Sequence, residues 1–283
     1  MNEQDTPPPR RFAPTSGEVR ATRSILASLG LATELILQVL DYAQYWTVIT
    51  TERIDHVTIL DEDWDNHFSA VEHYLWVPLH LGAHPDSEIP KMREIEFTIV
   101  SHDQGWTTER EAGPYETSSW FEVSRCRPRP GMPLPEPADD DEAYANIEQV
   151  RRDVDEQVEI FPRPSQEMEP MRRHCPEMMK VTWPRGYRKS KPALDEGTHA
   201  WWLQGNQVAR ATSIFEGEMV KRYRVVWGCA ANPRWEGNEG AGRGEGFVDS
   251  LKDGDRIAVW ARAKRRGWEN HIFGVRVVVR YTI

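Results

Sequence analysis

The chain has 283 residues, which is enough for one large domain or two small ones with an apolar core. Its hydrophobic fraction of 39 % and mean hydropathy of −0.66 are low for a fully compact globule, so we expect a folded part that carries polar segments. No run of about 18 apolar residues occurs, and the proline-rich start lacks the apolar centre of a secretory signal. We therefore expect neither a membrane span nor secretion.

The net charge of −10 is unevenly distributed. From Trp183 onward there are 18 Lys and Arg against 11 Asp and Glu, a balance of +7, so the first 182 residues carry −17. An acidic front and a basic back could attract one another, or the back could meet an acidic partner. The basic residues are scattered along apparent strands rather than gathered in a stripe, which does not indicate a nucleic-acid partner.

The three cysteines Cys126, Cys175 and Cys229 are odd in number and far apart. This pattern argues against a disulfide framework and favours a reducing compartment, the cytoplasm or the nucleus. No cysteines or histidines have the spacing of a zinc finger, and adjacent His174 and Cys175 are poorly placed to chelate together. We expect no metal and no cofactor.

Residues 1–17 read as a disordered arm, and residues 18–46 form the most helix-like stretch of the chain. Thr33 before Glu34 is a candidate helix cap. Apolar residues recur there at spacings of three and four, which predicts an amphipathic helical element. They are Leu29, Leu31, Leu35, Ile36, Val39, Leu40 and Ala43.

Residues 47–126 have the character of β-strands. The β-branched segment 47–60 predicts a strand pair with a turn near Glu52. In the segment 93–101, Ile95, Phe97 and Ile99 alternate with polar residues, as in a strand with one buried face.

Between residues 127 and 194 the chain becomes proline-rich and acidic, which predicts a largely disordered insertion with a short helix near 143–154. Residues 195–283 alternate aromatic or branched residues with arginine, as antiparallel strands with one wet face do, and 251–255 is a turn. The predicted fold is mainly β (α+β): an antiparallel β-sandwich, jelly-roll-like, split by the insertion, after an N-terminal helical element.

Two stretches resemble known proteins. The segment ATELILQVLDYAQYW is similar to the start of an F-box, with Leu31-Ala32 where a leucine-proline pair is typical. The blocks SHDQGW and GRGEGFVDSLKDGDRIAVWARA resemble a group of fungal proteins with an F-box-like start. The first resemblance implies a Skp1-type adaptor as partner, contacted by Leu31, Leu35, Ile36, Val39 and Leu40. The second implies lineage, compartment and architecture, but no particular chemistry.

Three loops carry the candidate ligand-binding residues. Loop tryptophans beside polar groups can stack on a sugar or another planar ligand, although both Gly-Trp pairs can equally be turn anchors. Adjacent Ser101, His102 and Asp103 cannot form a catalytic relay, because neighbours on an extended chain point to opposite sides. The alternative to ligand contact is a structured loop in which Asp103 and Ser101 hold backbone amides. The glycine-rich stretch 237–246 lacks the lysine of a phosphate loop and reads as a pliable loop at a sandwich end. The candidates are His102, Asp103, Gln104, Trp106, Arg243, Trp268, Asn270 and His271.

Two main functions stay open at this point. The first is a binding adaptor that recruits Skp1 through its helices and recognises a protein or glycan through sandwich loops. The second is an enzyme or accessory factor of fungal metabolism that uses the same loops as a small-molecule pocket. A purely structural protein that self-associates through aromatic edges is a third. Exposure of the apolar helix residues would favour the adaptor, and convergence of His102, Asp103, Arg243 and His271 in a cavity would favour the enzyme.

Overall fold

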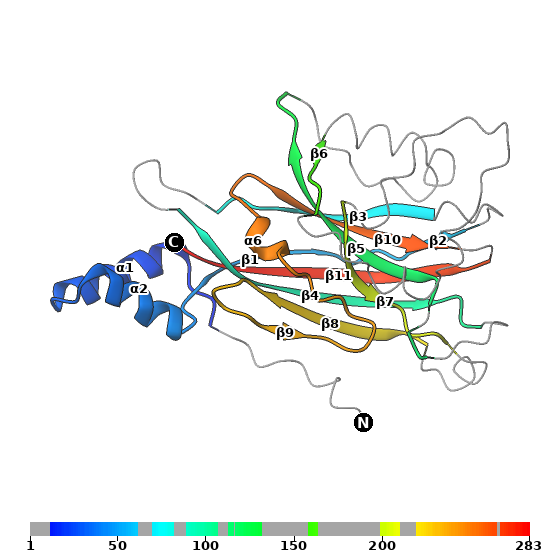
Figure 1. The fold of residues 1–283 in the computed structure, drawn as a ribbon, viewed down its shortest axis with the longest axis horizontal. Coiled ribbons are helices and arrows are strands. Elements are labelled where there is room, and N and C mark those ends of the chain that lie inside the picture. Colours follow the sequence, from blue (N-terminus) through cyan, green and yellow to red (C-terminus); the bar gives the residue numbers. More distant parts are fainter. Residues whose placement is uncertain are drawn as a thin grey trace.

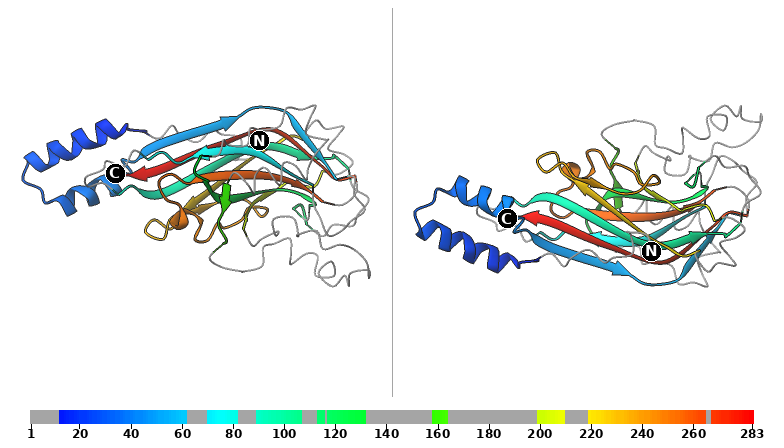
Figure 2. Two further views of the ribbon diagram at one scale, coloured as in Figure 1. Left: turned by 90° about the horizontal axis from the view of Figure 1, so that it is seen from above. Right: turned by 90° about the horizontal axis from the view of Figure 1, so that it is seen from below.

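The computed structural model describes residues 12–61, 70–81, 89–106, 113–115, 117–131, 158–163, 199–209, 219–264 and 267–283. Two antiparallel sheets pack face to face, and a pair of helices projects from one end of this sandwich, beside the C-terminus (Figures 1 and 2). The predicted β-sandwich with a helical N-terminal element is confirmed. Within the described residues, no helix is long and apolar enough to cross a membrane.

The first sheet, sheet A, is built around a very long pair of strands. Its order is β1 (Thr47–Arg53), β11 (Glu269–Thr282), β4 (Lys91–Asp103), β8 (Lys221–Gly228) and β9 (Trp235–Glu236), and β2 (Val57–Leu60) also pairs with β11. β1 and β2 follow one another along β11. The predicted strand pair with a turn at Glu52 was therefore wrong: the chain leaves β1 after Arg53, and long-range pairing with β11 outweighs a local hairpin.

The second sheet, sheet B, has the order β3 (Ala70–Pro78), β10 (Arg256–Ala263), β5 (Ser119–Pro128) and β6 (Val158–Ile160), with β7 (Trp201–Gly205) also on β5. β6 lies within the predicted insertion 127–194 and pairs with β5, so this part of the insertion is structured. The predicted helix near 143–154 lies outside the described residues.

The core lies between the sheets, where the alternating residues of the strands meet. Ile95, Phe97 and Ile99 are fully buried, as their alternation predicts. The Trp227 ring packs edge-on against Phe97 at 5.2 Å and against Phe247 of α6 (Phe247–Ser250) at 5.5 Å. Burying each large apolar side chain contributes about 1.5–3 kcal/mol, so this layer supplies most of the stability.

The helical hairpin consists of α1 (Ser16–Ser28) and α2 (Thr33–Tyr42). Thr15 caps α1 in a capping box with Glu18, a signal that our sequence reading passed over. Thr33 is the first residue of α2 rather than its cap, which is Ala32 without a side-chain bond. Ala32 has the extended backbone of a cap residue, so α2 begins at Thr33. A cap at Thr33 would place the start of the helix at Glu34.

Core contacts and polar contacts tie the hairpin to the sandwich. Val19, Ile36 and Leu40 are buried in the common core. The Asp41 carboxylate lies 3.0 Å from Arg93 of β4 and accepts a hydrogen bond from the Trp46 indole at 2.9 Å. These contacts hold the hairpin at one end of the sandwich and leave the rest of it projecting (Figure 2).

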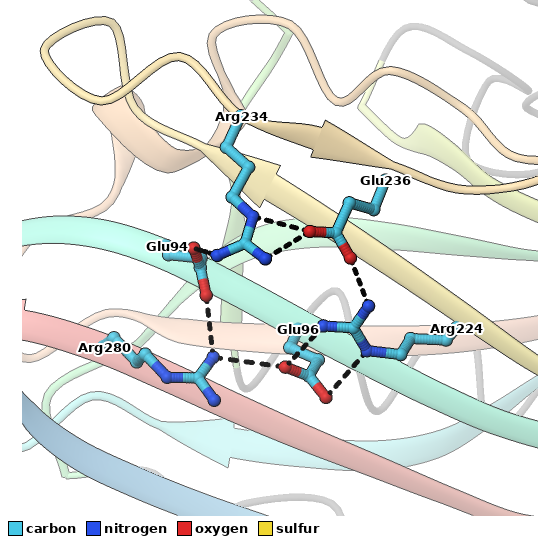
Figure 3. A network of polar contacts seen from close by, with 6 residues as sticks. All are labelled: Glu94, Glu96, Arg224, Arg234, Glu236 and Arg280. Carbon is cyan, nitrogen blue, oxygen red and sulfur yellow. Dashed lines mark hydrogen bonds and ion pairs between the residues drawn. The ribbon is translucent and has the colours of Figure 1, made fainter. Parts of the chain in front are cut away.

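An ionic network ties together four strands on the outer face of sheet A (Figure 3). The Glu94 carboxylate is fully buried and accepts from Arg234 at 2.8 Å and from Arg280 at 2.9 Å. Glu96 forms ion pairs with Arg224 at 3.1 Å and with Arg280 at 3.3 Å. Glu236 closes the network through Arg224 and Arg234. Three guanidinium groups thus balance three carboxylates.

We expect Glu94→Gln to lower the free energy of unfolding by about 2–4 kcal/mol, because Arg234 and Arg280 then each lose one of two carboxylate partners in a poorly solvated place. Urea unfolding measures the change. Glu52→Gln is the matched control: Glu52 and Arg276 lie 3.9 Å apart and are both about half exposed, so the loss there stays below about 0.5 kcal/mol. Equal effects of the two substitutions would contradict a structural role for the network.

A buried histidine on β3 makes the fold sensitive to acid. His73 packs against Trp76 at 4.1 Å and Trp260 at 5.4 Å, and its Nε2 has no hydrogen-bond partner within the described structure. Burial lowers the pKa of His73 from 6.5 to about 3, and the charge of Arg53 acts in the same direction. Between pH 3 and pH 6.5, therefore, the unfolded chain binds a proton at His73 that the folded chain does not bind.

We expect the stability contribution of neutral His73 to be complete above pH 6.5 and to be lost progressively as the pH falls from 6.5 toward 3. His73→Phe keeps a ring in the layer and removes the titration. The stability difference between pH 7 and pH 4.5, measured by urea unfolding, should therefore be smaller in this variant by a few kcal/mol. The exposed His80 supplies the control His80→Phe, which should retain the parent's pH dependence.

Candidate functional site

Two of the three predicted loops meet at the end of the sandwich opposite the helices. The end of β4 and the start of β11 are neighbours, with His102 opposite His271 and Asp103 opposite Asn270. The Glu269 amide donates to the side chain of Gln104 at 3.5 Å. This loop end, residues 101–106 and 267–271, is our candidate ligand surface.

Asp103 is an anchor of the backbone. Its carboxylate is fully buried and accepts from the Gly105 amide and from the Ala209 amide, both at 2.9 Å. Burial raises its pKa, while the two amides lower it. Gly105 follows with φ of +84°, a conformation that favours glycine. The alternative prediction, that Asp103 holds backbone amides, is confirmed; the buried carboxylate does not face solvent and is not placed to contact a ligand.

Asn270 was also misassigned as a ligand residue. It is fully buried, its amide donates to the carbonyls of Trp120 and Arg262 at 3.2 and 3.1 Å, and its oxygen accepts from Asn206 at 2.9 Å. Asn206 also donates to Ser119 and accepts from the Ser101 hydroxyl. This satisfied polar cluster joins sheet A to sheet B inside the loop end.

The two loop tryptophans differ. Trp268 is 5 % exposed, and its carbonyl accepts from the Asp61 amide at 3.1 Å, so it pins its turn to the sandwich and offers no stacking surface. Trp106 is 55 % exposed. The Gln104 amide donates to its carbonyl at 2.7 Å. Of the two tryptophans predicted to stack on a ligand, only Trp106 faces solvent. The two Gly-Trp pairs look alike in the sequence, and this pattern does not reveal which tryptophan is buried.

A row of stacked rings crosses the outer face of sheet A at the loop end. The His102 and His271 rings are 4.5 Å apart and nearly parallel. His56, which precedes β2, stacks on Phe273 at 4.7 Å and on His271 at 6.0 Å. The Phe273 and His102 rings are 5.6 Å apart. We call His56, His102, His271 and Phe273 the histidine ladder.

Hydrogen bonds assign the protons of the ladder. His271 Nε2 lies 2.5 Å from the Glu269 carboxylate, which only accepts, so Nε2 carries a proton and Nδ1 can accept from Thr58 at 3.1 Å. His102 Nδ1 faces the carbonyl of Asp103 and therefore donates to it. Burial lowers the pKa of His102, and the charges of His271 and His56 lower it further, against the opposing effect of Glu269.

These rings do not form a metal centre. Stacked imidazoles direct their nitrogens side by side rather than toward one point. In the part of the chain that the structure describes, no group of three or more histidine, cysteine, aspartate or glutamate side chains is arranged to hold a metal ion. The ladder is therefore an aromatic and titratable surface.

The glycine-rich segment 237–246 is held firmly along the side of the sandwich. Four indole groups donate to its carbonyls: Trp201 to Glu245, Trp202 to Gly240, and both Trp227 and Trp235 to Gly242, at 2.8–3.0 Å. These tryptophans come from both sheets, so the segment bridges their edges. The prediction of a pliable loop at a sandwich end was wrong, because composition does not reveal the indole donors.

Arg243 is exposed and lies over the Trp235 ring at 5.3 Å. Trp235 is opposite Trp227, which is in turn opposite Ile95 of β4. His102 is seven residues further along β4, and at about 3.3 Å per residue this is about 23 Å. The structure thus does not bring Arg243 to the loop end.

We expect Gly242→Ala to destabilise the fold by about 3 kcal/mol or more, because the new Cβ would lie 1.9 Å from the Trp202 carbonyl oxygen. Thermal and urea unfolding measure the loss. In the control Gly17→Ala, on α1, the nearest atom to the new Cβ is Thr15 Oγ1 at 3.9 Å, and the change leaves stability unchanged or raises it by about 0.5 kcal/mol. A tolerated alanine at position 242 would show that the segment is loose after all.

The helical hairpin carries most of the exposed large apolar side chains. On α2, Leu35, Val39 and Tyr42 share one face at spacings of four and three, and they are 50, 47 and 89 % exposed. Leu31 precedes them at 36 %. We call Leu31, Leu35, Val39 and Tyr42 the hairpin surface; the neighbouring residues Ile25, Leu29 and Leu37 are also exposed.

Ile36 and Leu40 are 4 and 7 % exposed and belong to the core, so their prediction as partner contacts was wrong. The predicted single stripe splits into two faces, one turned to the sandwich and one to solvent. Periodicity marks both faces as apolar and cannot tell which of them is covered.

Sequence reasoning missed His56, Thr58, Glu269 and Phe273, which complete the ladder. The signal was the register of the strands: on adjacent antiparallel strands, residues opposite one another share a face. That register becomes visible only when β2 and β4 are both paired with β11.

Comparison with known proteins gives one structural likeness. No family model and no curated protein matches the chain. Among solved structures, the metal-free form of lectin I-B4 from Griffonia simplicifolia is 10 % identical and aligns with a TM-score of 0.29 over 83 % of this chain and 93 % of the lectin chain. At this TM-score the likeness says nothing about ligand or partner.

Proposed function

We propose that this chain is an intracellular binding adaptor of F-box type. In this proposal the hairpin surface docks on a Skp1-type adaptor protein, and the loop end recognises a protein or glycan client. The observation that carries the proposal is the apolar face of α2, with Leu35 and Val39 about half exposed on a projecting hairpin. A monomeric soluble protein rarely leaves such a group uncovered, and contiguous exposed apolar residues mark interaction sites.

The placement of the hairpin supports this role. Helix-in-groove recognition uses apolar anchors at spacings of three, four and seven on one helix face, which Leu35, Val39 and Tyr42 provide. The base of the hairpin is anchored by Ile36, Leu40 and Asp41, so docking needs no detachment from the sandwich. The loop end lies at the other end of the molecule, which leaves it open to a client while the hairpin is occupied (Figure 1).

The arrangement gives less support to an enzyme pocket. That alternative requires His102, Asp103, Arg243 and His271 to converge. Asp103 is buried in a turn and Arg243 lies far along the sheet, so only the two histidines meet. We therefore do not pursue a catalytic function.

We expect Leu35→Glu/Val39→Glu to weaken binding to a purified Skp1-type adaptor by about 100-fold or more, since each anchor contributes about 1.5–3 kcal/mol when buried. Titration calorimetry measures the affinity. The variant should keep the parent's thermal stability, because both side chains already face solvent.

Two controls make this result specific. Ile54→Glu introduces the same charge at an apolar side chain that is 75 % exposed on the sandwich, and it should bind as the parent does. Ile36→Ala should lower stability by about 2–4 kcal/mol, since Ile36 is a core residue. Absence of adaptor binding by the folded parent protein would refute the F-box-type role.

A further inference from the structure

The histidine ladder has a geometry that responds to protons. Three imidazoles, from β4, β11 and the connection before β2, stack within 4.5–6.0 Å, and neutral rings stack favourably in this way. Imidazolium rings at the same separation repel one another. Histidine is the side chain whose ordinary pKa places its charge change between pH 5 and 8, so mild acidification reaches this stack.

The surroundings of the ladder offer little compensation for added positive charge. On β11, Glu269 faces the stack but already holds His271. Before β2, Asp55 is paired with Arg53 at 2.8 Å. On β8, Arg222 adds to the positive side: it is opposite Val100, which shares the outer face of sheet A with His102.

The carboxylate nearest the ladder on β4 is also already hydrogen-bonded. The Asp103 carboxylate points into the sandwich and accepts from the Gly105 and Ala209 amides. The His102 ring is half-buried, so water solvates its protonated form only in part. Added protons on the stack therefore meet one carboxylate that is already paired, the cationic Arg222 on the same face and a poorly solvated site.

The ladder also sits at the roots of the loop end. His102 is the next-to-last residue of β4, and the loop 104–106 follows directly. β11 begins directly after the turn at Gly267 and Trp268, and His271 is its third residue. His56 occupies the connection between β1 and β2. A change in the stack thus acts on both segments of the loop end and on the β1–β2 connection beside them.

We propose that the histidine ladder is a proton-sensitive latch: while His102 is neutral the stacked rings hold the loop end in place, and protonation of His102 in acid loosens that end. The proposal goes beyond the adaptor role and needs no partner protein. The sign follows from linkage. His102 has a lowered pKa in the folded state, so the loosened state binds more protons and gains as the pH falls below 6.5.

The experiment is amide hydrogen exchange of the full chain at pH 7.5 and pH 5.5, corrected for the intrinsic exchange rate at each pH. Peptides covering 101–106 and 267–271 should lose protection in acid relative to core strands such as β4 around Phe97. The expected loss at pH 5.5 is several-fold and at most about tenfold, the limit that linkage sets at one pH unit below the ordinary histidine pKa of 6.5.

The variants separate titration from packing. His102→Phe keeps a stacked ring and cannot take a proton, so its loop end should stay protected at pH 5.5. His80→Phe, which removes an exposed histidine outside the ladder, should behave as the parent does. Loss of protection to the same degree in the parent and in His102→Phe, or no loss in either, would overturn the proposal.

A second measurement covers the case in which His102→Phe disturbs the loop. The pKa of His102 is read from its imidazole Cε1–H shift by NMR, in the parent and in His56→Phe. His56 is exposed, so its substitution spares the core, and it removes a positive neighbour. The pKa of His102 should lie below 6.5 in the parent and rise in the variant. A value at or above 6.5 in the parent, or one that His56→Phe leaves unchanged, means that the rings are not coupled.

Discussion

The antiparallel pairing of β4 with β11 is the interaction on which the rest of the structure depends. It runs from Met92 opposite Tyr281, next to the helices, to Asp103 opposite Asn270 at the loop end. Its inward side chains supply the core of sheet A, and its outward side chains supply both the ionic network and part of the histidine ladder. Because the side-chain period of a strand is two, a slip by one residue would exchange these faces entirely.

Two sets of hydrogen bonds join the two sheets around this strand pair. At the loop end, Asn206 and Asn270 satisfy each other and the neighbouring backbone, which makes a buried polar cluster tolerable. Along the side, four indoles bind the glycine-rich segment, and glycine is needed where a Cβ would strike backbone or ring. The high tryptophan content therefore reflects construction of the sandwich more than ligand stacking.

The molecule presents different chemistry at its two ends. The hairpin end is apolar and rests on a core-anchored base, whereas the loop end combines the exposed Trp106 with titratable rings. In the proposed adaptor, one end would bind constitutively and the other would respond to protons. The stiff β4–β11 pair between them keeps the two ends at a constant separation.

The sequence by itself determined the long strand β4 and its buried face, since the alternation of Ile95, Phe97 and Ile99 reflects a period imposed by the backbone. It also located both the hairpin and the segments 101–106 and 267–271, because apolar periodicity and glycine-tryptophan turns are local signals. Only the tertiary structure decided which apolar face of α2 is covered, that Asn270 binds backbone carbonyls in the interior, and that His56 joins His102 and His271. These outcomes depend on pairings between residues as many as 215 positions apart, and no local pattern encodes which strand a given strand will meet.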